Sequence, residues 1–406
     1  MSGDRLVTLF LGWVGVRAVL HNGWWLVTSF YMVVDAQLSP AQLLVIAAAQ
    51  GIASMIFEVP AGVLADAVSR KWAIVVAHPL MAVAMITTGL FPDFVPLLLA
   101  QMLWGISWTF SSGADIAWIT DELDRPELID RVLARQARRQ LLGAVVGMLG
   151  VGGLAALVGR QSAIVAAGVL MLALGAAVAF AFPERNFTPI RTGRLRVSLD
   201  IARRGARLAV RDRTILALVV VTVLVNGAAD SFGRIYPLQL HALGFPAGGP
   251  GTVWSTVLGI GALVIGALSL RAVEQRIYGE RGARGAMLLA CAAGVLGLGM
   301  LGLAPDLTTA LVAVLVASGV AMPLVRTVTT IWVNRRTSSD VRATVHSFLA
   351  QAEYGGEILC AGLLAALSGV LGSAGAFIFT AALFGASMLV ISLGRRARVT
   401  TTGARR

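Results

Sequence analysis

The chain has 406 residues, of which 57% are hydrophobic and only 13% are charged, and its net charge is +12. A soluble globular protein carries about twice that share of charged residues, so the composition excludes an ordinary soluble fold. The apolar residues gather in runs of about 20 or more, the length that spans a bilayer. We therefore expect an all-α polytopic membrane protein.

The positive charge indicates membrane topology and not nucleic-acid binding. Almost all of the 33 lysines and arginines fall in alternate loops or in the termini, on one side of the expected membrane. This positive-inside pattern places both termini in the cytoplasm and lets the loops contact anionic lipid. We expect no nucleic-acid partner. The preference for Arg over Lys favours a bacterial source, and hence the bacterial inner membrane as the location.

The apolar runs predict about twelve membrane spans in two halves. The expected spans cover residues 6–34, 40–65, 72–91, 94–118, 139–159, 162–182, 213–238, 252–271, 285–304, 307–332, 344–368 and 373–394. The expected domains are a six-helix bundle over 1–182, a basic cytoplasmic linker over 183–212, a second six-helix bundle over 213–394 and a basic tail over 395–406. Within the linker, residues 198–210 are expected either to lie on the membrane surface as an amphipathic segment or to be solvated.

The two halves share a short pattern. Asn22-Gly23 lies in the outer part of the first expected span, and Asn226-Gly227 recurs at an offset of 204 residues in the seventh. With six expected spans on each side of a basic linker, this echo predicts two parallel repeats related by an axis along the membrane normal.

A polar hairpin between the second and third expected spans carries the clearest motif. Residues 62–71 read G-V-L-A-D-A-V-S-R-K. They resemble the signature loop of the major facilitator superfamily, G-x-L-x-D-R/K-x-G-R/K-R/K. Ala67 stands where a basic residue is usual, and Ser69 stands where glycine is usual. The matching positions are Gly62, Leu64, Asp66, Arg70 and Lys71.

The resemblance implies a two-domain carrier that works by alternating access, with its substrate site between the halves near mid-membrane. We expect Gly62 to permit a close helix approach. We expect a conformational latch that holds the two halves in one state, or else a charged turn that only fixes topology. The expected latch residues are Gly62, Asp66, Arg70, Lys71, Asp115 and Asp121.

Within the superfamily, the chain most resembles bacterial drug-efflux carriers. The resemblance rests on Glu58-Val59-Pro60-Ala61-Gly62 before the signature loop and on a glycine-rich fifth span. Two positions depart from the pattern. Gln101 stands where many proton-coupled members have an arginine, and Met148 replaces the proline of the antiporter signature G-x-x-x-G-P-x-x-G-G.

Ionisable side chains inside the expected spans are functional candidates, because each costs several kcal/mol unless it is paired or wetted. Arg17 and Glu58 lie at similar depths and are expected to pair. Arg326 and Glu353 also match in depth, and Glu357 lies one turn from Glu353. We expect Glu58, Glu353 or Glu357 to carry a proton. The alternative for all of these residues is purely structural pairing.

Other polar and aromatic residues are expected to face the substrate. Asp230 and Arg234 are one turn apart, so they can neutralise each other, at an outer gate or beside the substrate. His21 lies one turn beyond Arg17 and is expected either to join a proton relay or to hydrogen-bond a neighbouring helix. Aromatic rings suit amphipathic or cationic molecules. The expected cavity residues are His21, Asn22, Trp25, Tyr31, Trp108, Asn226, Asp230, Arg234, Gln351 and Tyr354.

Three functional hypotheses follow. The first is proton-coupled efflux of a hydrophobic or amphipathic compound. The second is a proton symporter or uniporter that imports a small polar metabolite, which Gln101 favours slightly. The third is a receptor or scaffold that does not transport. The sequence contains no metal-ligand spacing, phosphate-binding loop or nucleophile elbow. We therefore expect no enzymatic activity, no cofactor and no metal, and a monomer whose partners are a small-molecule substrate, protons and membrane lipid.

Overall fold

The computed structural model describes residues 3–189, 212–274, 276–277, 279–337 and 339–393. Most of the expected linker, including residues 198–210, and the whole expected tail lie outside the described residues. All the regular structure in the described residues is helical. Eleven of the helical segments described are long and apolar enough to cross a membrane. The expected all-α polytopic membrane fold is confirmed.

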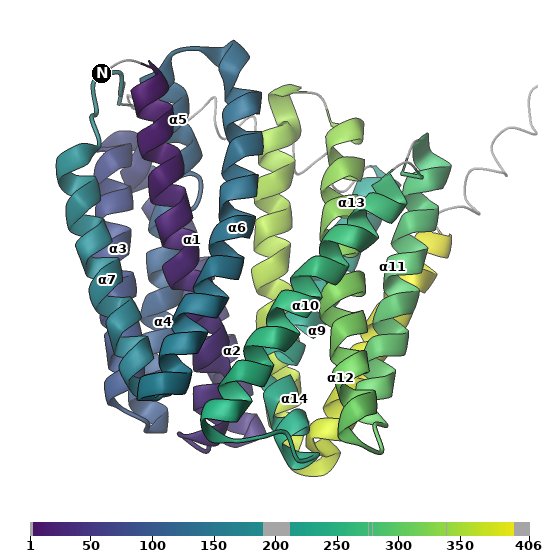
Figure 1. Ribbon diagram of the computed structural model, residues 1–406. Helices are drawn as coiled ribbons and strands as arrows, with labels where there is room; N and C mark the ends of the chain where they lie inside the picture. Colours follow the sequence, from purple (N-terminus) through teal and green to yellow (C-terminus); the bar gives the residue numbers. More distant parts are fainter. Residues whose placement is uncertain (1–2, 190–211, 275, 278, 338, 394–406) are drawn as a thin grey trace, which may run out of the picture. The chain divides into compact units, whose positions relative to one another are not determined.

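The helices follow the expected spans closely (Figure 1). They are α1 (Gly3–Val34), α2 (Pro40–Ala67), α3 (Arg70–Leu90), α4 (Phe94–Ser111), α5 (Ala114–Leu123), α6 (Pro126–Val158), α7 (Arg160–Ala181), α9 (Arg213–Ala242), α10 (Gly248–Glu274), α11 (Gly279–Gly302), α12 (Leu307–Leu315), the π-helical η1 (Val316–Ala321), α13 (Met322–Arg336) and α14 (Ser339–Leu393).

Several expected spans contain a local break. Gly113 separates α4 from α5 with φ +78, a left-handed conformation that favours glycine. The tenth expected span runs through α12, η1 and α13. The last two expected spans form α14, in which Gly372 has non-helical angles of φ 60 and ψ −173. This kink lies between the two expected spans, so α14 is consistent with two membrane crossings.

The start of α6 departs from the expectation. The helix is 33 residues long and begins at Pro126, whereas the expected span covers 139–159. Residues 127–138, expected as part of a charged loop, read E-L-I-D-R-V-L-A-R-Q-A-R. Leu, Arg, Ala, Glu and Gln are good helix formers, and proline is tolerated at the first helical position. Hydrophobicity alone marked the apolar part of this helix and missed its polar extension.

The chain forms two compact units. Unit 1 contains Met1–Ser39, Ala49–Thr192 and Pro246–Gly259. Unit 2 contains Pro40–Ala48, Gly193–Phe245 and Ile260–Arg406. The helices α2 and α10 each contribute residues to both units, whereas α1 and α3–α7 belong to unit 1 and α9 and α11–α14 belong to unit 2.

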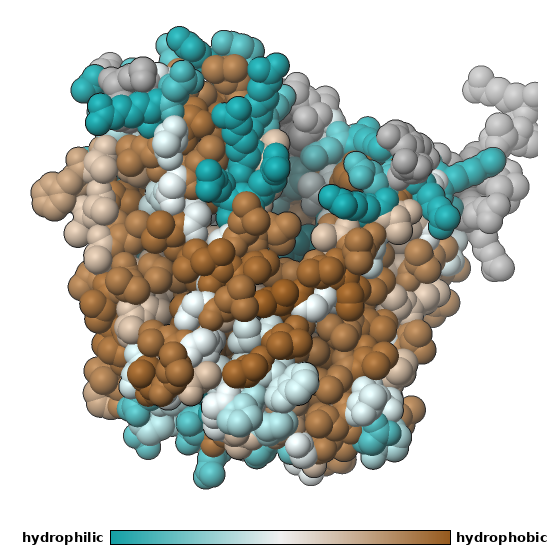
Figure 2. Space-filling view, viewed as in Figure 1, coloured by the Kyte–Doolittle hydropathy of each residue, from teal (hydrophilic) through white to brown (hydrophobic). Residues whose placement is uncertain are grey.

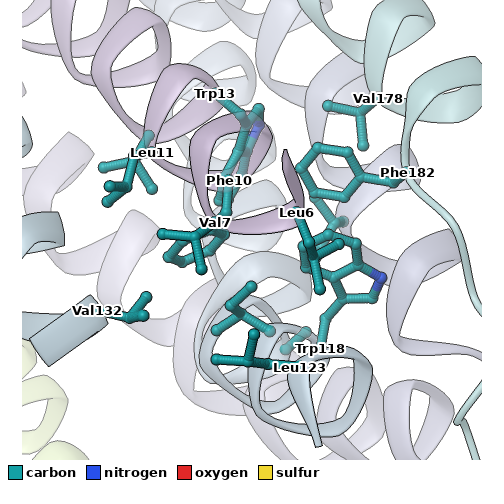
Figure 3. Packing of buried hydrophobic residues seen from close by; sticks show 14 of the residues in the cluster. Leu6, Val7, Phe10, Leu11, Trp13, Trp118, Leu123, Val132, Val178 and Phe182 are labelled. Atoms are coloured by element: carbon teal, nitrogen blue, oxygen red, sulfur yellow. The ribbon is translucent and has the colours of Figure 1, made fainter. Parts of the chain in front are cut away.

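Aromatic rings fill the core of unit 1 near the start of α1 (Figure 3). Trp118 of α5 stacks on Phe182 with ring centroids 4.1 Å apart, and Phe10 lies 6.3 Å from Trp118. The indole nitrogen of Trp118 donates a hydrogen bond to the carbonyl of Pro183 at 2.9 Å. Because this buried N–H has a partner, the ring packs without leaving an unsatisfied donor. The core fixes α5 and the end of α7 against α1.

The surface of unit 1 suits a lipid environment. Figure 2 shows brown, apolar side chains over the middle of its helices and teal, hydrophilic side chains at their ends. Leu157 of α6 and Phe180 of α7 are 85% and 92% exposed. An exposed apolar belt of this kind is unfavourable in water and favourable in the hydrocarbon core of a bilayer.

Glycines allow a very close helix contact in each unit. A Cβ atom added at Gly147 of α6 would lie 2.1 Å from the carbonyl oxygen of Val19 in α1. A Cβ atom added at Gly356 of α14 would lie 2.1 Å from the carbonyl oxygen of Val223 in α9. No side chain fits at either position, so both helix pairs depend on glycine for their separation.

Candidate functional site

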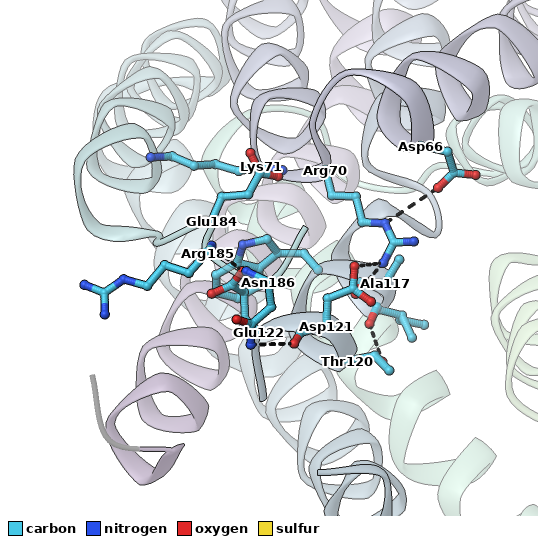
Figure 4. Close-up of polar contacts among 12 residues, drawn as sticks. Asp66, Arg70, Lys71, Ala117, Thr120, Asp121, Glu122, Glu184, Arg185 and Asn186 are labelled. Carbon is cyan, nitrogen blue, oxygen red and sulfur yellow. Dashed lines mark hydrogen bonds and ion pairs between the residues drawn. The ribbon is translucent and has the colours of Figure 1, made fainter. Parts of the chain in front are cut away.

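The polar hairpin after α2 forms a charged network in unit 1 (Figure 4). Arg70, the first residue of α3, forms an ion pair and a hydrogen bond with Asp121 of α5. Its Nε lies 3.6 Å from Oδ1 of Asp66, and its Nη1 donates to the carbonyl of Ala117 at 3.0 Å. Three expected latch residues are thus in contact, and they join the end of α2, the start of α3 and the end of α5.

Glu184 is a member of this network that the sequence did not reveal. Its Oε2 accepts a hydrogen bond from Ser69 Oγ at 2.5 Å, and its Oε1 accepts one from the backbone N–H of Lys71 at 2.9 Å. Ser69 also caps α3, because its Oγ accepts a hydrogen bond from the N–H of Trp72. This cap gives a local reason for serine in place of the usual glycine. The residues Asp66, Ser69, Arg70, Asp121 and Glu184 are called the Arg70 network below.

Other expected latch residues lie outside the Arg70 network or enter it only through the backbone. The expected close approach at Gly62 was wrong, since an added Cβ atom would meet no described atom within 4 Å. The ammonium group of Lys71 lies 5.8 Å from the ring of Trp72. Asp115 lies at the start of α5, where it accepts a hydrogen bond from the N–H of Ile116 at 2.8 Å. Its placement with Asp121 was wrong, because the two residues lie at opposite ends of α5.

Unit 1 also contains a cluster of aromatic rings between α1 and α4. His21 stacks on Trp104 with ring centroids 5.4 Å apart and an interplanar angle of 17°. Trp104 lies 6.0 Å from Trp24, 5.3 Å from Trp25 and 5.8 Å from Trp108. These five residues are called the tryptophan cluster. The buried Nε2 of His21 has no hydrogen-bond partner in the described part of the chain.

Arg17 lies beside the tryptophan cluster. Its Nη2 donates to Ser111 Oγ at 2.5 Å, and its guanidinium carbon lies 5.1 Å from the ring centroid of Trp108. Its charge also interacts with that of Asp115. Within the described residues, Arg17 and Glu58 do not form the expected ion pair. The positive charge is stabilised by aromatic rings, a hydroxyl group and a more distant carboxylate.

Unit 2 brings five expected residues into one charged cluster. Asp230 Oδ1 lies 3.7 Å from Arg234 Nε on the same helix, α9. The charge of Glu357 on α14 interacts with Asp230, Arg234, Glu353 and Arg326. Three carboxylates therefore face two guanidinium groups within membrane-length helices, so full ionisation would leave an excess negative charge.

A cavity of about 450 Å³ adjoins this cluster inside unit 2. It is lined by residues from α9, η1, α13 and α14, among them Asn226, Arg326 and Glu353. The buried hydroxyl of Thr329 also lines it and has no hydrogen-bond partner among the described residues. The cavity therefore presents one cation, one anion and several hydrogen-bonding groups to a small molecule.

The remaining expected cavity residues have other positions. Tyr31 is enclosed in unit 1 with 3% of its surface exposed. The side chain of Asn22 donates to the carbonyl of Ala18 on its own helix at 2.9 Å. Gln351 and Tyr354 lie on α14 but are not among the residues that line the unit 2 cavity. In the residues described, no group of three or more His, Cys, Asp or Glu is arranged to hold a metal ion.

A second charged network lies in unit 2, and sequence reasoning missed it. Arg336 is the last residue of α13, and its Nη2 lies 2.5 Å from Glu280 Oε1 at the start of α11. Its Nη1 lies 3.1 Å from Asp212 Oδ2. Asp212 also caps α9, since its Oδ1 accepts a hydrogen bond from the N–H of Thr214 at 2.8 Å. The sequence predicted these charged residues in loops, and only the fold brings them into contact.

Comparison with known families identifies the architecture that carries these sites. The model of the Major Facilitator Superfamily matches residues 14–359. The chain belongs to this superfamily. It is therefore a multi-pass membrane transporter, and the resemblance of its signature loop is confirmed at the level of the superfamily. A comparison with curated proteins found no match.

Solved structures of other superfamily transporters share the fold of this one. The nucleoside transporter NupG matches with a TM-score of 0.74 and 14% identity, over 96% of this chain and 98% of its own. An auto-inhibited POT family peptide transporter matches with a TM-score of 0.74 and 14% identity, over 99% of each chain. A bacterial homologue of the human lysosomal transporter Spinster matches with a TM-score of 0.72 and 14% identity, over 97% of each chain. At such low identity, the likeness establishes the fold and not the substrate.

Proposed function

We propose that this transporter exchanges protons for an amphipathic organic compound and moves that compound out of the cell. The charged cluster of unit 2 carries the proposal. Ionisable groups within membrane helices are costly, and in transporters they mark ion and proton pathways. Glu357 is the best candidate for the proton carrier, because its charge interacts with all four other members of the cluster.

The tryptophan cluster supports an amphipathic substrate. Its four indole rings and His21 provide flat apolar surfaces that favour stacking with an organic molecule. The Arg70 network supports a conformational latch, because it joins three helix ends through charged contacts. We place the protein in the bacterial inner membrane with both termini in the cytoplasm, as the positive-inside pattern favours. Two six-helix domains over 1–182 and 213–394 would work as a monomer.

Import of a small polar metabolite is the second candidate function. The unit 2 cavity favours it, because Thr222, Asn226 and Thr329 offer hydrogen-bonding groups to a polar solute. The solved structures of similar fold include a nucleoside transporter and a peptide transporter, whose names indicate polar substrates. A receptor or scaffold is less well supported, since it has no use for charges that the membrane disfavours.

Proton movement in everted vesicles tests the proposal. Acid-loaded vesicles would receive lipophilic cations, neutral antibiotics or small polar metabolites in parallel. We expect a lipophilic compound to release protons in wild type and in the control Glu274→Gln, which alters an exposed carboxylate at the end of α10. The signal should vanish in Glu357→Gln. A response to polar metabolites alone, or flux that ignores the pH gradient, would favour the importer or uniporter.

A further inference from the structure

The cavity of unit 2 contains a cationic and an anionic side chain that do not form an ion pair with each other. Arg326 on α13 and Glu353 on α14 both line it and interact electrostatically across it. Within the described chain, neither charged group has a direct ion pair or a hydrogen-bond partner. Charges within membrane helices are costly and usually pair with one another. Their separation within one cavity is therefore the feature that needs a physical explanation.

Thr329 provides a second, independent observation. Its side chain lines the same cavity and is 8% exposed, and its buried Oγ1 has no hydrogen-bond partner in the described chain. A buried hydroxyl without a partner is unfavourable, so this atom indicates a missing hydrogen-bonding group. The hydroxyl lies on α13, less than one turn from Arg326 along the helix.

The backbone beside the cavity is also unusual. Residues 316–321 form the π-helical η1, and Ser318 of this segment lines the cavity. π-Helical turns occur frequently at functional sites. Val225, Met322 and Leu349 form an apolar part of the wall, and the other lining residues include several threonines, Asn226 and His346. The cavity thus combines an apolar patch and hydrogen-bonding side chains with one positive and one negative group.

We propose that this cavity binds a zwitterion with an apolar body. The anionic group of the ligand contacts Arg326, its cationic group contacts Glu353, and the apolar body lies against Val225 and Leu349. The volume of about 450 Å³ falls in the range of small-molecule sites. A purely cationic ligand would leave Arg326 unmatched, and a purely anionic ligand would leave Glu353 unmatched.

This inference rests on the proposed function, since it assigns the chemical class of the compound that the transporter moves. It also separates two roles on α14. Glu353 binds the cationic group of the ligand, and Glu357, one turn further along, remains free to carry the proton. The charged cluster can therefore respond to both ligand and proton without one displacing the other from the same carboxylate.

Binding to the purified full-length protein in nanodiscs, measured by calorimetry without a pH gradient, tests the inference. The probes are two zwitterions with different charge spacing, phenylalanine and ε-aminocaproate, and the amide and N-acetyl form of each. We expect at least one zwitterion to bind about tenfold more tightly than both of its singly charged forms, as a lost charged hydrogen bond predicts.

Two variants assign the contacts. Arg326→Gln should weaken zwitterion binding about tenfold and leave the cationic amide unaffected, and Glu353→Gln should leave the N-acetyl form unaffected instead. The controls are Arg271→Gln and Glu274→Gln, which remove exposed charges at the end of α10. Thr329→Val keeps both charges and the side-chain shape, so it weakens binding without changing the preference for zwitterions.

Two results would overturn the inference. One is equal affinity for a zwitterion and its amide, and the other is the absence of binding by every probe. If the probes fail while a lipophilic cation still drives proton flux, the zwitterion assignment is wrong and proton-coupled efflux stands. If the zwitterion binds as expected but no compound moves protons, the proposed function fails and the assignment of the cavity stands.

Discussion

The two units share one helix contact and surround it with different chemistry. In unit 1, Gly147 packs against the backbone of Val19, and in unit 2, Gly356 packs in the same way against Val223. The neighbouring Asn22 and Asn226 each donate to the carbonyl four residues earlier, at 2.9 and 3.0 Å. The contact is therefore a property of the backbone and of small residues.

The surroundings of the contact differ sharply. Unit 1 places the tryptophan cluster there, with Arg17 as a neighbouring charge. Unit 2 places the charged cluster there, with Asp230 on α9 and Glu357 on α14. A shared scaffold thus carries an aromatic surface in one unit and ionisable groups in the other. We propose that unit 1 contributes aromatic contacts to the substrate, and that unit 2 contributes both charges that bind the substrate and the coupling to protons.

The charged networks at the helix ends also differ in which end of a helix carries the cation. In unit 1 the cation, Arg70, begins α3 and contacts Asp121 at the end of α5. In unit 2 the cation, Arg336, ends α13 and contacts Glu280 at the start of α11. Each network joins the start of one helix to the end of another. The contact between helix ends therefore requires opposite charges, and either helix end can carry the cation.

The largest expected effect comes from filling the shared contact. Gly147→Ala and Gly356→Ala would each place a methyl group 2.1 Å from a backbone oxygen. Overpacking of this kind costs about 3 kcal/mol where the backbone cannot move. Thermal unfolding in detergent should show a similar loss for both variants. Gly153→Ala and Gly362→Ala are matched controls on α6 and α14, since an added Cβ there meets no described atom within 4 Å. Equal stability of all four variants would contradict the shared contact.

The sequence predicted the fold better than the site. The helices could be predicted because apolar runs and sidedness are local signals. The Asn-Gly echo predicted a repeat and not the close contacts, which the structure places at Gly23 and Gly227. The polar start of α6 was missed because hydropathy does not register a charged amphipathic helix. Depth along a helix placed Arg17 near Glu58, but it does not give the direction in which each side chain points. Arg17 therefore contacts Ser111 and Trp108 instead.

Contacts between residues that lie far apart in the sequence could not be predicted either. Glu184 contacts Ser69 across 115 positions, and Arg336 contacts Asp212 across 124. Both carboxylates read as ordinary loop charges beside basic residues. By contrast, the pairing of Asp230 with Arg234 and the shared face of Glu353 and Glu357 follow from helical spacing alone, and the structure brings all four into one cluster.

A smaller effect should distinguish the buried cations of the two units. Arg234→Gln removes the partner of Asp230 within unit 2 and should cost about 2 kcal/mol, because an uncompensated buried carboxylate remains. Arg17→Gln should cost less, because no carboxylate forms a direct ion pair with Arg17 in the described chain. Unfolding in denaturant measures both. The double variant Asp230→Asn/Arg234→Gln should recover part of the lost stability, and strict additivity would show that the two charges are independent.

The networks at the helix ends should give effects of about 1 kcal/mol or less, since their charges are partly exposed. Asp121→Asn removes the main partner of Arg70, whose side chain is 18% exposed. Glu280→Gln should be milder, because Arg336 keeps Asp212 at 3.1 Å. We also expect Asp66→Asn to slow transport while the amount of protein in the membrane stays normal. Unchanged turnover in a flux assay would remove the latch role from the Arg70 network.

The smallest expected effect is at His21, where the aromatic and proton-carrying interpretations of unit 1 differ. His21→Phe keeps the stacking on Trp104 and removes a buried ring nitrogen that has no partner in the described chain. Stability should therefore change by less than about 0.5 kcal/mol. Transport should keep its wild-type pH dependence, whereas Glu357→Gln should alter it. Trp104→Ala is the control that removes the aromatic surface, and it should weaken substrate affinity. If His21→Phe instead abolished proton coupling, unit 1 would share the proton pathway, and the division between an aromatic unit and a charged unit would fail.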